Sequence, residues 1–139
     1  MSSDKFQKLK IKEYSFWELY LHPQQYYLGR TYIWAKRSDA LDLMDMQPQE
    51  QEELFDIARQ VNKALSELFH PDLMNYAALG NVANHLHLHI IPRYSSSRRY
   101  DEIEFVDEQW GKNYAPYETS FQVPPSTLMK IKNAISLKL

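Results

Sequence analysis

Three histidines, His85, His87 and His89, alternate with aliphatic residues in the run HLHLHI. In a β-strand, successive side chains point to opposite faces, so this strand would carry the three imidazoles in a row and bury its aliphatic side chains. Imidazole titrates near neutral pH, so its neutral form can attack phosphorus and its cationic form can stabilise phosphate oxygens. The middle residue, His87, is flanked on both sides. The pattern therefore predicts that His87 attacks while its two neighbours hold the charge.

Two other interpretations of the histidine row stay open. The histidines could be the ligands of a metal-dependent hydrolase, because two histidines separated by one residue on a strand are a good pair of zinc ligands. A third histidine on the same straight strand would reach the ion poorly. The row could also be the polar side of a half-buried edge strand, but three histidines in register beside a strongly apolar face argue against that.

The remaining composition excludes several other kinds of site. Cysteine is absent, which excludes disulfide frameworks, cysteine-based zinc sites, iron–sulfur clusters and thiol nucleophiles. The three glycines, Gly29, Gly80 and Gly111, lie far apart, so neither a Walker loop nor a dinucleotide-binding glycine fingerprint is present. The formal net charge of −2 gives no general attraction to nucleic acid polymers or anionic membranes.

The length and composition predict one compact domain. The chain has 139 residues, of which 44% are hydrophobic and 14% aromatic, enough to fill a core. Residues 1–13 are polar and lysine-rich without the apolar stretch of a signal peptide, and no run of about 20 apolar residues occurs. We therefore expect a cytoplasmic protein with no membrane partner.

The residues before the histidine row predict a hairpin and a helix. Residues 16–21 and 30–37 are rich in aromatic and branched side chains and flank a turn-prone segment, which favours two paired strands. Residues 48–68 carry apolar side chains at helical spacing, and Pro48 suits the first helical position. This helix is the main helix of the predicted fold.

Further strands and a second helix follow. Residues 75–81 and 85–94 predict two strands, and residues 103–106 a short one, before an aromatic loop at 110–117. Ser126 is the expected cap of a final helix. Strands, a helix and more strands predict an α+β fold with an antiparallel sheet.

The run HLHLHII at positions 85–91 matches the His-φ-His-φ-His-φ-φ signature, in which φ is hydrophobic, and so resembles the histidine triad (HIT) superfamily. The following Pro92-Arg93 is similar to the fragile histidine triad branch of dinucleoside polyphosphate hydrolases. The order of a hairpin ending near Gly29, a helix starting at Pro48 and a strand bearing Asn75 is also similar to that family.

The resemblance covers about residues 16–94, and the tail is similar to a bacterial branch with a C-terminal extension. It implies a single HIT-like domain over residues 1–139, with a core at about 14–94 and an extension at 95–139. The implied architecture is an antiparallel sheet with a main helix and a C-terminal helix, paired across a homodimer.

The resemblance also implies an activity. The chain would be a nucleotide hydrolase or nucleotidyl transferase acting at a nucleoside α-phosphate, on a dinucleoside polyphosphate or a nucleoside phosphoramidate. His87 would form a covalent nucleotidyl-histidine, with His85 and His89 orienting it and contacting the phosphate. The implied nucleotide-binding positions are Tyr20 and Tyr32 at the base, His22 at the ribose, and Asn75, Asn81 and Val82 near the phosphates.

Three positions depart from the family pattern. Arg30 stands where several branches carry a fourth histidine, and it keeps a donor but cannot share a proton. Val82 stands where a hydroxyl is frequent, so only its backbone N–H could serve the phosphate. His22 stands where a carboxylate or amide is usual. These departures concern the choice of substrate more than the type of reaction.

The partners and cofactors implied by the resemblance are few. We expect a nucleotide substrate, a homodimer and no tightly bound metal or cofactor, with magnesium accompanying a polyphosphate substrate without being held by the protein. A nucleotide-binding module with little turnover stays open as an alternative, beside the metal-dependent hydrolase.

Overall fold

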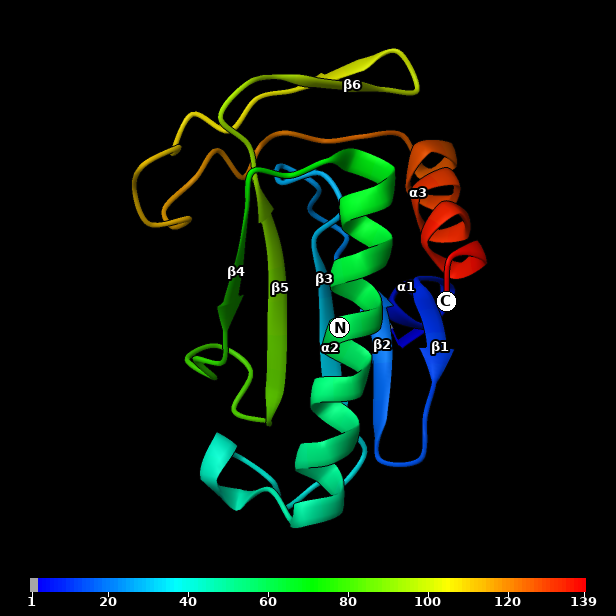
Figure 1. Ribbon diagram of the computed structural model, residues 1–139, viewed down its shortest axis with the longest axis vertical. Coiled ribbons are helices and arrows are strands. Elements are labelled where there is room, and N and C mark those ends of the chain that lie inside the picture. Colours follow the sequence, from blue (N-terminus) through cyan, green and yellow to red (C-terminus); the bar gives the residue numbers. More distant parts are fainter. Residues whose placement is uncertain (1–2) are drawn as a thin grey trace.

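A computed structural model describes residues 3–139 and confirms the predicted α+β fold. Five strands form one antiparallel sheet in the order β1-β2-β3-β5-β4, and helix α2 crosses one face of it (Figure 1). A separate hairpin and helix α3 belong to the C-terminal extension. In chain order the elements are α1 (Ser3–Lys8), β1 (Lys10–Glu13), β2 (Trp17–Leu21), β3 (Thr31–Ala35), a 3-10 helix (Leu43–Asp45), α2 (Pro48–Phe69), β4 (Leu73–Ala77), β5 (His87–Arg93), β6 (Arg98–Tyr100), β7 (Ile103–Phe105) and α3 (Pro125–Leu137).

Helix α2 begins at the predicted residue and ends one residue later than predicted. Pro48 occupies the first turn, and the backbone N–H of Gln47 donates to a side-chain oxygen of Glu50 at 2.8 Å. The helix stops at Phe69 because His70 adopts a left-handed conformation with φ 51°. No helix of residues 3–139 is long and apolar enough to cross a membrane. The buried stripe of α2 consists of Leu54, Ile57, Ala58, Val61, Ala64, Leu65 and Phe69.

Alternation along β3 separates the two faces of the sheet. Ile33 is fully buried in the core that α2 covers, whereas Tyr32 and Trp34 point to the opposite face. In the neighbouring strand β5, His87 pairs with Trp34 and His89 pairs with Tyr32. The histidines therefore lie on the face that α2 leaves uncovered.

The turn that leads into β3 approaches α2 closely at Gly29. Its φ is +89°, and an added Cβ would lie 2.9 Å from Leu65 Cδ2 and 3.0 Å from the ring of Phe69. Glycine meets both requirements, because it adopts positive φ readily and has no Cβ.

Each predicted strand is shorter than expected, and in β4 and β5 the difference affects candidate site residues. Strand β4 ends at Ala77, so Asn81 lies in the loop that follows it. That loop turns at Gly80, whose φ of +64° is not compatible with a continuing strand. Strand β5 begins at His87, so His85 precedes the strand instead of belonging to it.

The extension packs on the core through α3, but Ser126 is not the cap of this helix. The carbonyl of Pro124 accepts hydrogen bonds from the N–H groups of Thr127 and Leu128, and Pro124 itself is the N-cap residue. Ile131 and Ile135 are fully buried in the main core cluster. Figure 1 shows α3 beside α2, above the β1 end of the sheet.

Residues 3–13 contain two elements that the sequence did not predict. The short helix α1 precedes β1, and β1 pairs with β2 with an irregularity between Lys10 and Lys12. Because β1 is an edge strand with Lys12 and Glu13 on its exposed positions, it lacks the apolar alternation that predicts a strand.

Candidate functional site

A row of imidazole and aromatic rings occupies the sheet face opposite α2. The His85 ring stacks on Trp34 with ring centroids 4.2 Å apart, and Trp34 lies 5.2 Å from His87. The rings of His87 and His89 are 4.8 Å apart. The three histidines therefore form one row, and Trp34 of β3 contacts both His85 and His87 within it.

Backbone carbonyls fix the tautomers of His85 and His87. His87 Nδ1 lies 2.6 Å from the His85 carbonyl oxygen, and Nδ1 must carry the proton because a carbonyl can only accept. The lone pair of the neutral His87 ring is therefore on Nε2. In the same way, His85 Nε2 donates to the Ala35 carbonyl at 2.6 Å. The two rings thus present different nitrogens for chemistry.

His89 is held in the tautomer opposite to that of His87. Arg30 Nη2 lies 3.4 Å from His89 Nδ1, and because a guanidinium only donates, Nδ1 accepts and the proton of the neutral ring is on Nε2. Burial, the positive charge of Arg30 and the nearby His87 together lower the pKa of His89 to about 3, and burial contributes most. His89 is therefore a neutral N–H donor near pH 7.

His22 joins the row from the end of β2. Its ring lies 5.7 Å from His89, and its Nδ1 accepts a hydrogen bond from the Gln24 N–H at 3.0 Å. Burial lowers the pKa of His22 to about 2, with a further contribution from the charge of Arg30. In this state His22 offers one donor, Nε2–H, because its Nδ1 is engaged by Gln24.

Tyr20 and Tyr32, the two residues expected at the base, lie together. Their rings stack with centroids 5.2 Å apart and planes 10° apart, and both side chains are buried. The Tyr20 hydroxyl donates to Glu18 at 3.1 Å, and burial raises the pKa of both tyrosines. The stacked pair forms one continuous surface beside His22 and leaves no slot between the two rings.

The three residues expected near the phosphates are not placed alike. Asn75 pairs with Ile91 on β5. Its Oδ1 accepts a hydrogen bond from Arg93 Nη1 at 2.9 Å, so this side chain is engaged by Arg93. Asn81 and Val82 are exposed in the loop between β4 and β5. That loop leads directly into His85 and His87, so the two residues precede the histidine row along the chain.

Sequence reasoning missed the contact between Arg30 and the C-terminal extension. The Arg30 side chain is 5% exposed, and its Nη1 donates to the Tyr117 hydroxyl at 3.0 Å. The guanidinium also lies over the rings of Tyr114 and Tyr117, at 5.4 and 5.6 Å from their centroids. The residues are 87 positions apart, so no local pattern could have predicted the contact.

Arg93 anchors the segment that brings these tyrosines to the site. It is buried in an ion pair with Asp107, at 2.7 Å from Nε to Oδ2, and it also donates to the carbonyls of Gln109 and Lys112. The Tyr27 hydroxyl donates to the Tyr114 carbonyl at the same place. The arginine that follows the histidine row therefore has a structural role in holding the extension.

The described residues offer no evident metal centre. Within residues 3–139, no three histidine, cysteine, aspartate or glutamate side chains are arranged to hold a metal ion. His85, His87 and His89 each use one ring nitrogen in a hydrogen bond to another part of the protein.

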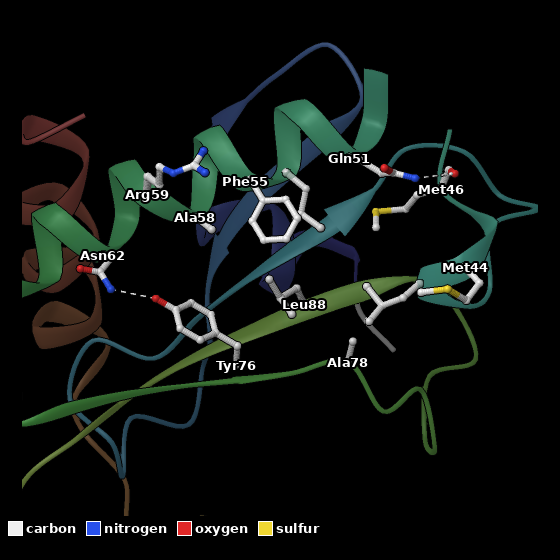
Figure 2. A pocket seen from close by; sticks show the side chains of 12 residues that line it. Met44, Met46, Gln51, Phe55, Ala58, Arg59, Asn62, Tyr76, Ala78 and Leu88 are labelled. Carbon is white, nitrogen blue, oxygen red and sulfur yellow. Dashed lines mark hydrogen bonds between the residues drawn. The ribbon is translucent and has the colours of Figure 1, made fainter. Parts of the chain in front are cut away.

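A groove of about 830 Å³ lies on the other side of the sheet, between α2 and β4. Figure 2 shows Phe55 of α2 and Tyr76 of β4 facing each other across it, with Leu88 between them and Met44 at one end. Asn62 Nδ2 donates to the Tyr76 hydroxyl at 2.8 Å. The groove is apolar and separated from the histidine row by the sheet.

The geometry of the row suits nucleophilic attack at phosphorus. His87 Nε2 has a lone pair, and His89 Nε2 carries a proton that can be donated to a phosphate oxygen. Arg30 adds a buried positive charge without proton exchange.

Comparison with known proteins gives one family match and several similar structures. The HIT domain family matches residues 28–96. A search of curated proteins finds no match. A histidine triad protein from Bradyrhizobium japonicum is 21% identical with a TM-score of 0.79, covering 99% of this chain and 96% of that chain.

Two further structures are similar over almost the whole chain. A histidine triad (HIT) protein from Sinorhizobium meliloti 1021 is 17% identical with a TM-score of 0.80, covering 100% of this chain and 96% of that chain. A hypothetical histidine triad nucleotide-binding protein from Sulfolobus tokodaii strain7 is 16% identical with a TM-score of 0.71, covering 94% and 82%. These identities show a shared fold and do not single out the fragile histidine triad branch that Pro92-Arg93 resembles.

Proposed function

Because the chain belongs to the histidine triad (HIT) domain superfamily, we propose that it binds a nucleotide and acts at its α-phosphate as a hydrolase or nucleotidyl transferase. The similarity to the Sulfolobus tokodaii protein, which is described as nucleotide-binding, supports this proposal. The observation that carries it is the tautomer of His87, whose Nδ1–H is engaged by a carbonyl and whose Nε2 lone pair is therefore available.

The proposed reaction has two steps. His87 Nε2 forms a bond to the α-phosphorus while the bond from phosphorus to the leaving oxygen or nitrogen breaks. The leaving group takes that electron pair, and an amine leaving group also takes a proton from solvent. The imidazole ring then carries a positive charge, which its Nδ1–H shares with the His85 carbonyl. Water next attacks phosphorus, the phosphorus–nitrogen bond breaks, the electron pair returns to Nε2, and a proton of the water passes to solvent.

The neighbouring groups have separate roles in this scheme. His89 donates its Nε2–H to a phosphate oxygen, and the His85 carbonyl keeps the His87 ring in the attacking orientation. The stacked Tyr20 and Tyr32 provide an apolar wall for the base beside His22. The substrate would be a dinucleoside polyphosphate or a nucleoside phosphoramidate.

The proposal is tested by trapping the nucleotidyl-histidine. The wild-type protein is mixed with a nucleotide substrate labelled at its α-phosphate, quenched in base and digested, and the peptides are weighed by mass spectrometry. We expect one nucleotidyl group on the peptide that contains His87, and none in the His87→Gly variant. His70→Asn is a matched control, because His70 lies at the end of α2 and asparagine tolerates its left-handed backbone.

The same experiment separates the alternatives. Turnover of His87→Gly within about tenfold of wild type, which is about 1.4 kcal/mol in barrier, would assign the attack to another group. Loss of activity on chelation without any adduct would support a metal-dependent hydrolase. Nucleotide binding without adduct or turnover would support a binding module.

We further propose that the protein holds no tightly bound metal and that magnesium arrives with a polyphosphate substrate. A nucleoside phosphoramidate has no polyphosphate chain to bring the ion. Turnover of such a substrate is therefore expected to survive chelation.

We also propose a homodimer formed across β4 and the groove beside α2. Within residues 3–139, β4 pairs only with β5 and has one free edge, and an antiparallel pair of two β4 edges would be related by a two-fold axis. Leu73, Tyr76 and Phe55 present exposed apolar surface there. Arg59 and Asp56 lie along the rim, so the patch carries both signs of charge, as a self-complementary contact requires.

A further inference from the structure

Arg30 is a buried cation that contacts the histidine row without an ionic partner. Within residues 3–139, none of the ion pairs formed by an arginine involves Arg30, and its Nε has no hydrogen-bond partner. A buried charge left without a counter-charge is costly. The fold nevertheless holds Arg30 in place with two hydroxyphenyl rings and directs one of its nitrogens at His89.

We propose that Arg30 is a positioning residue that holds His89 as an Nε2–H donor toward the substrate phosphate, and that the C-terminal extension belongs to the active site because Tyr117 holds Arg30. The inference rests on the proposed attack at the α-phosphate. It assigns a function to the extension, which supplies no atom to the histidine row itself.

The argument starts from the hydrogen-bonding capacity of the two side chains. A histidine next to His89 could donate or accept, and the His89 ring could then take either tautomer. A guanidinium has only N–H groups, so it accepts nothing and stabilises the tautomer in which His89 Nδ1 is bare. At 3.4 Å the contact is long, so the orientation of the guanidinium depends on its other partner, the Tyr117 hydroxyl.

The surroundings of His89 contain no group that would oppose this effect. His87 on the same strand, Tyr32 on β3 and His22 after β2 face the ring, with centroids at 4.8, 5.9 and 5.7 Å. On β4 the paired residue is Ala77, which is not titratable. Arg30 is the only charged side chain among these neighbours, and it disfavours a second proton on His89.

Nitrogen NMR of the free protein tests the proposal without any turnover. In a long-range ¹H–¹⁵N spectrum of wild type, we expect His89 to show a bare Nδ1 and a protonated Nε2 between about pH 5 and pH 8. In Arg30→Met, which removes the donors and the charge but keeps an apolar stem, we expect the neutral His89 ring to populate the Nδ1–H tautomer as well, because no donor then faces Nδ1. A wild-type His89 with its proton on Nδ1, or an unchanged His89 in Arg30→Met, overturns the proposal.

Kinetics then connect the tautomer with the reaction. Arg30→Met is expected to lower kcat by about 10–100-fold, the loss typical of removing a second-layer partner of an active-site histidine, with a smaller change in KM. Arg30→Lys keeps a charge and a donor and should recover part of that loss. Tyr117→Phe keeps the ring but removes the acceptor for Arg30 Nη1. It should therefore shift the His89 tautomer in the same direction as Arg30→Met, by a smaller amount.

Controls separate this proposal from the proposed function. Arg99→Met removes an exposed arginine of β6 and should leave the His89 spectrum and kcat as in wild type. If His87 forms no adduct while His89 responds to Arg30 as expected, the proposed reaction fails and the positioning contact stands. If the adduct forms while His89 does not respond, the positioning role is wrong and the reaction stands.

Discussion

His85 contributes two different groups to the histidine row, and only one of them is its side chain. Its carbonyl accepts the Nδ1–H of His87, while its ring stacks on Trp34 and donates to the Ala35 carbonyl. An alanine at position 85 keeps the carbonyl, so the orientation of His87 does not depend directly on the His85 imidazole.

This division predicts unequal effects of substitution. We expect His89→Ala to lose about 10²–10³-fold in kcat, the cost of one donor to a developing charge, and His85→Ala to lose less. Both variants should still form some nucleotidyl-His87, measured by burst kinetics with a labelled substrate. Equal and complete loss of the adduct in both variants would contradict these roles and fit a metal cage better.

His22 and His89 also couple the stability of the protein to pH. The ordinary histidine pKa is 6.5, and the folded protein lowers it to about 2 and about 3. Between these values the unfolded chain binds more protons than the folded one, so the free energy of unfolding falls as the pH falls below about 6.5. For two histidines we expect a loss of about 4 kcal/mol between about pH 7 and about pH 5.

Urea denaturation at the two pH values measures this loss. His22→Asn keeps an acceptor for the Gln24 N–H and removes one titrating group, so it should show about half of the wild-type pH dependence. Most carboxylates titrate below this window and contribute little to the difference. The same pH dependence in wild type and His22→Asn would show that His22 is not held neutral by the fold.

At the scale of elements, the turn before β3 depends on a close approach to α2. Gly29→Ala places a Cβ against Leu65 and Phe69 in addition to the strain of positive φ. Gly111→Ala has a similar φ of +84° but no atom within 4 Å of the added Cβ, so it measures the strain alone. We expect Gly111→Ala to cost about 1–2 kcal/mol and Gly29→Ala about 1–3 kcal/mol more. Equal costs in denaturant unfolding would show that α2 yields to the added methyl group.

The elements that the sequence predicted are those with a distinctive apolar composition or period. The stripe of α2, the aromatic and branched side chains of β2 and β3, and the alternation in β5 are visible without the structure. The edge strand β1 has no such pattern and is defined by its pairing with β2. Strand β4 ends before the predicted residue and β5 begins after it, because the chain between them forms a loop around Gly80.

The same distinction applies to the site. The histidine row follows from alternation, so it could be predicted from residues 85–89 alone. The tautomers depend on the His85 carbonyl and on Arg30, and the position of Arg30 depends on Tyr117 in a segment held by Arg93 and Asp107. These contacts join distant parts of the chain, and sequence spacing does not determine them.

At the scale of the whole molecule, the two faces of the sheet present different surfaces. The histidine row is on one face, and the apolar groove between α2 and β4 is on the other. A second copy placed on the groove would therefore cover apolar surface without obstructing the histidines. The exposed Phe55 and Tyr76 would be buried in such a pair, whereas a monomer leaves them in water.

This arrangement predicts a dimer whose two copies separate when one charged residue is introduced in the groove. Light scattering of wild type at micromolar concentration should give a mass near twice 16.6 kDa. Phe55→Glu should give a folded monomer, because the Phe55 side chain is exposed in one copy and its replacement leaves the core of that copy intact. Leu137→Glu introduces the same charge at an exposed leucine of α3, outside the groove, and should remain dimeric. A monomeric wild type would remove the dimer, whereas a dimeric Phe55→Glu would show that the two copies meet on another surface.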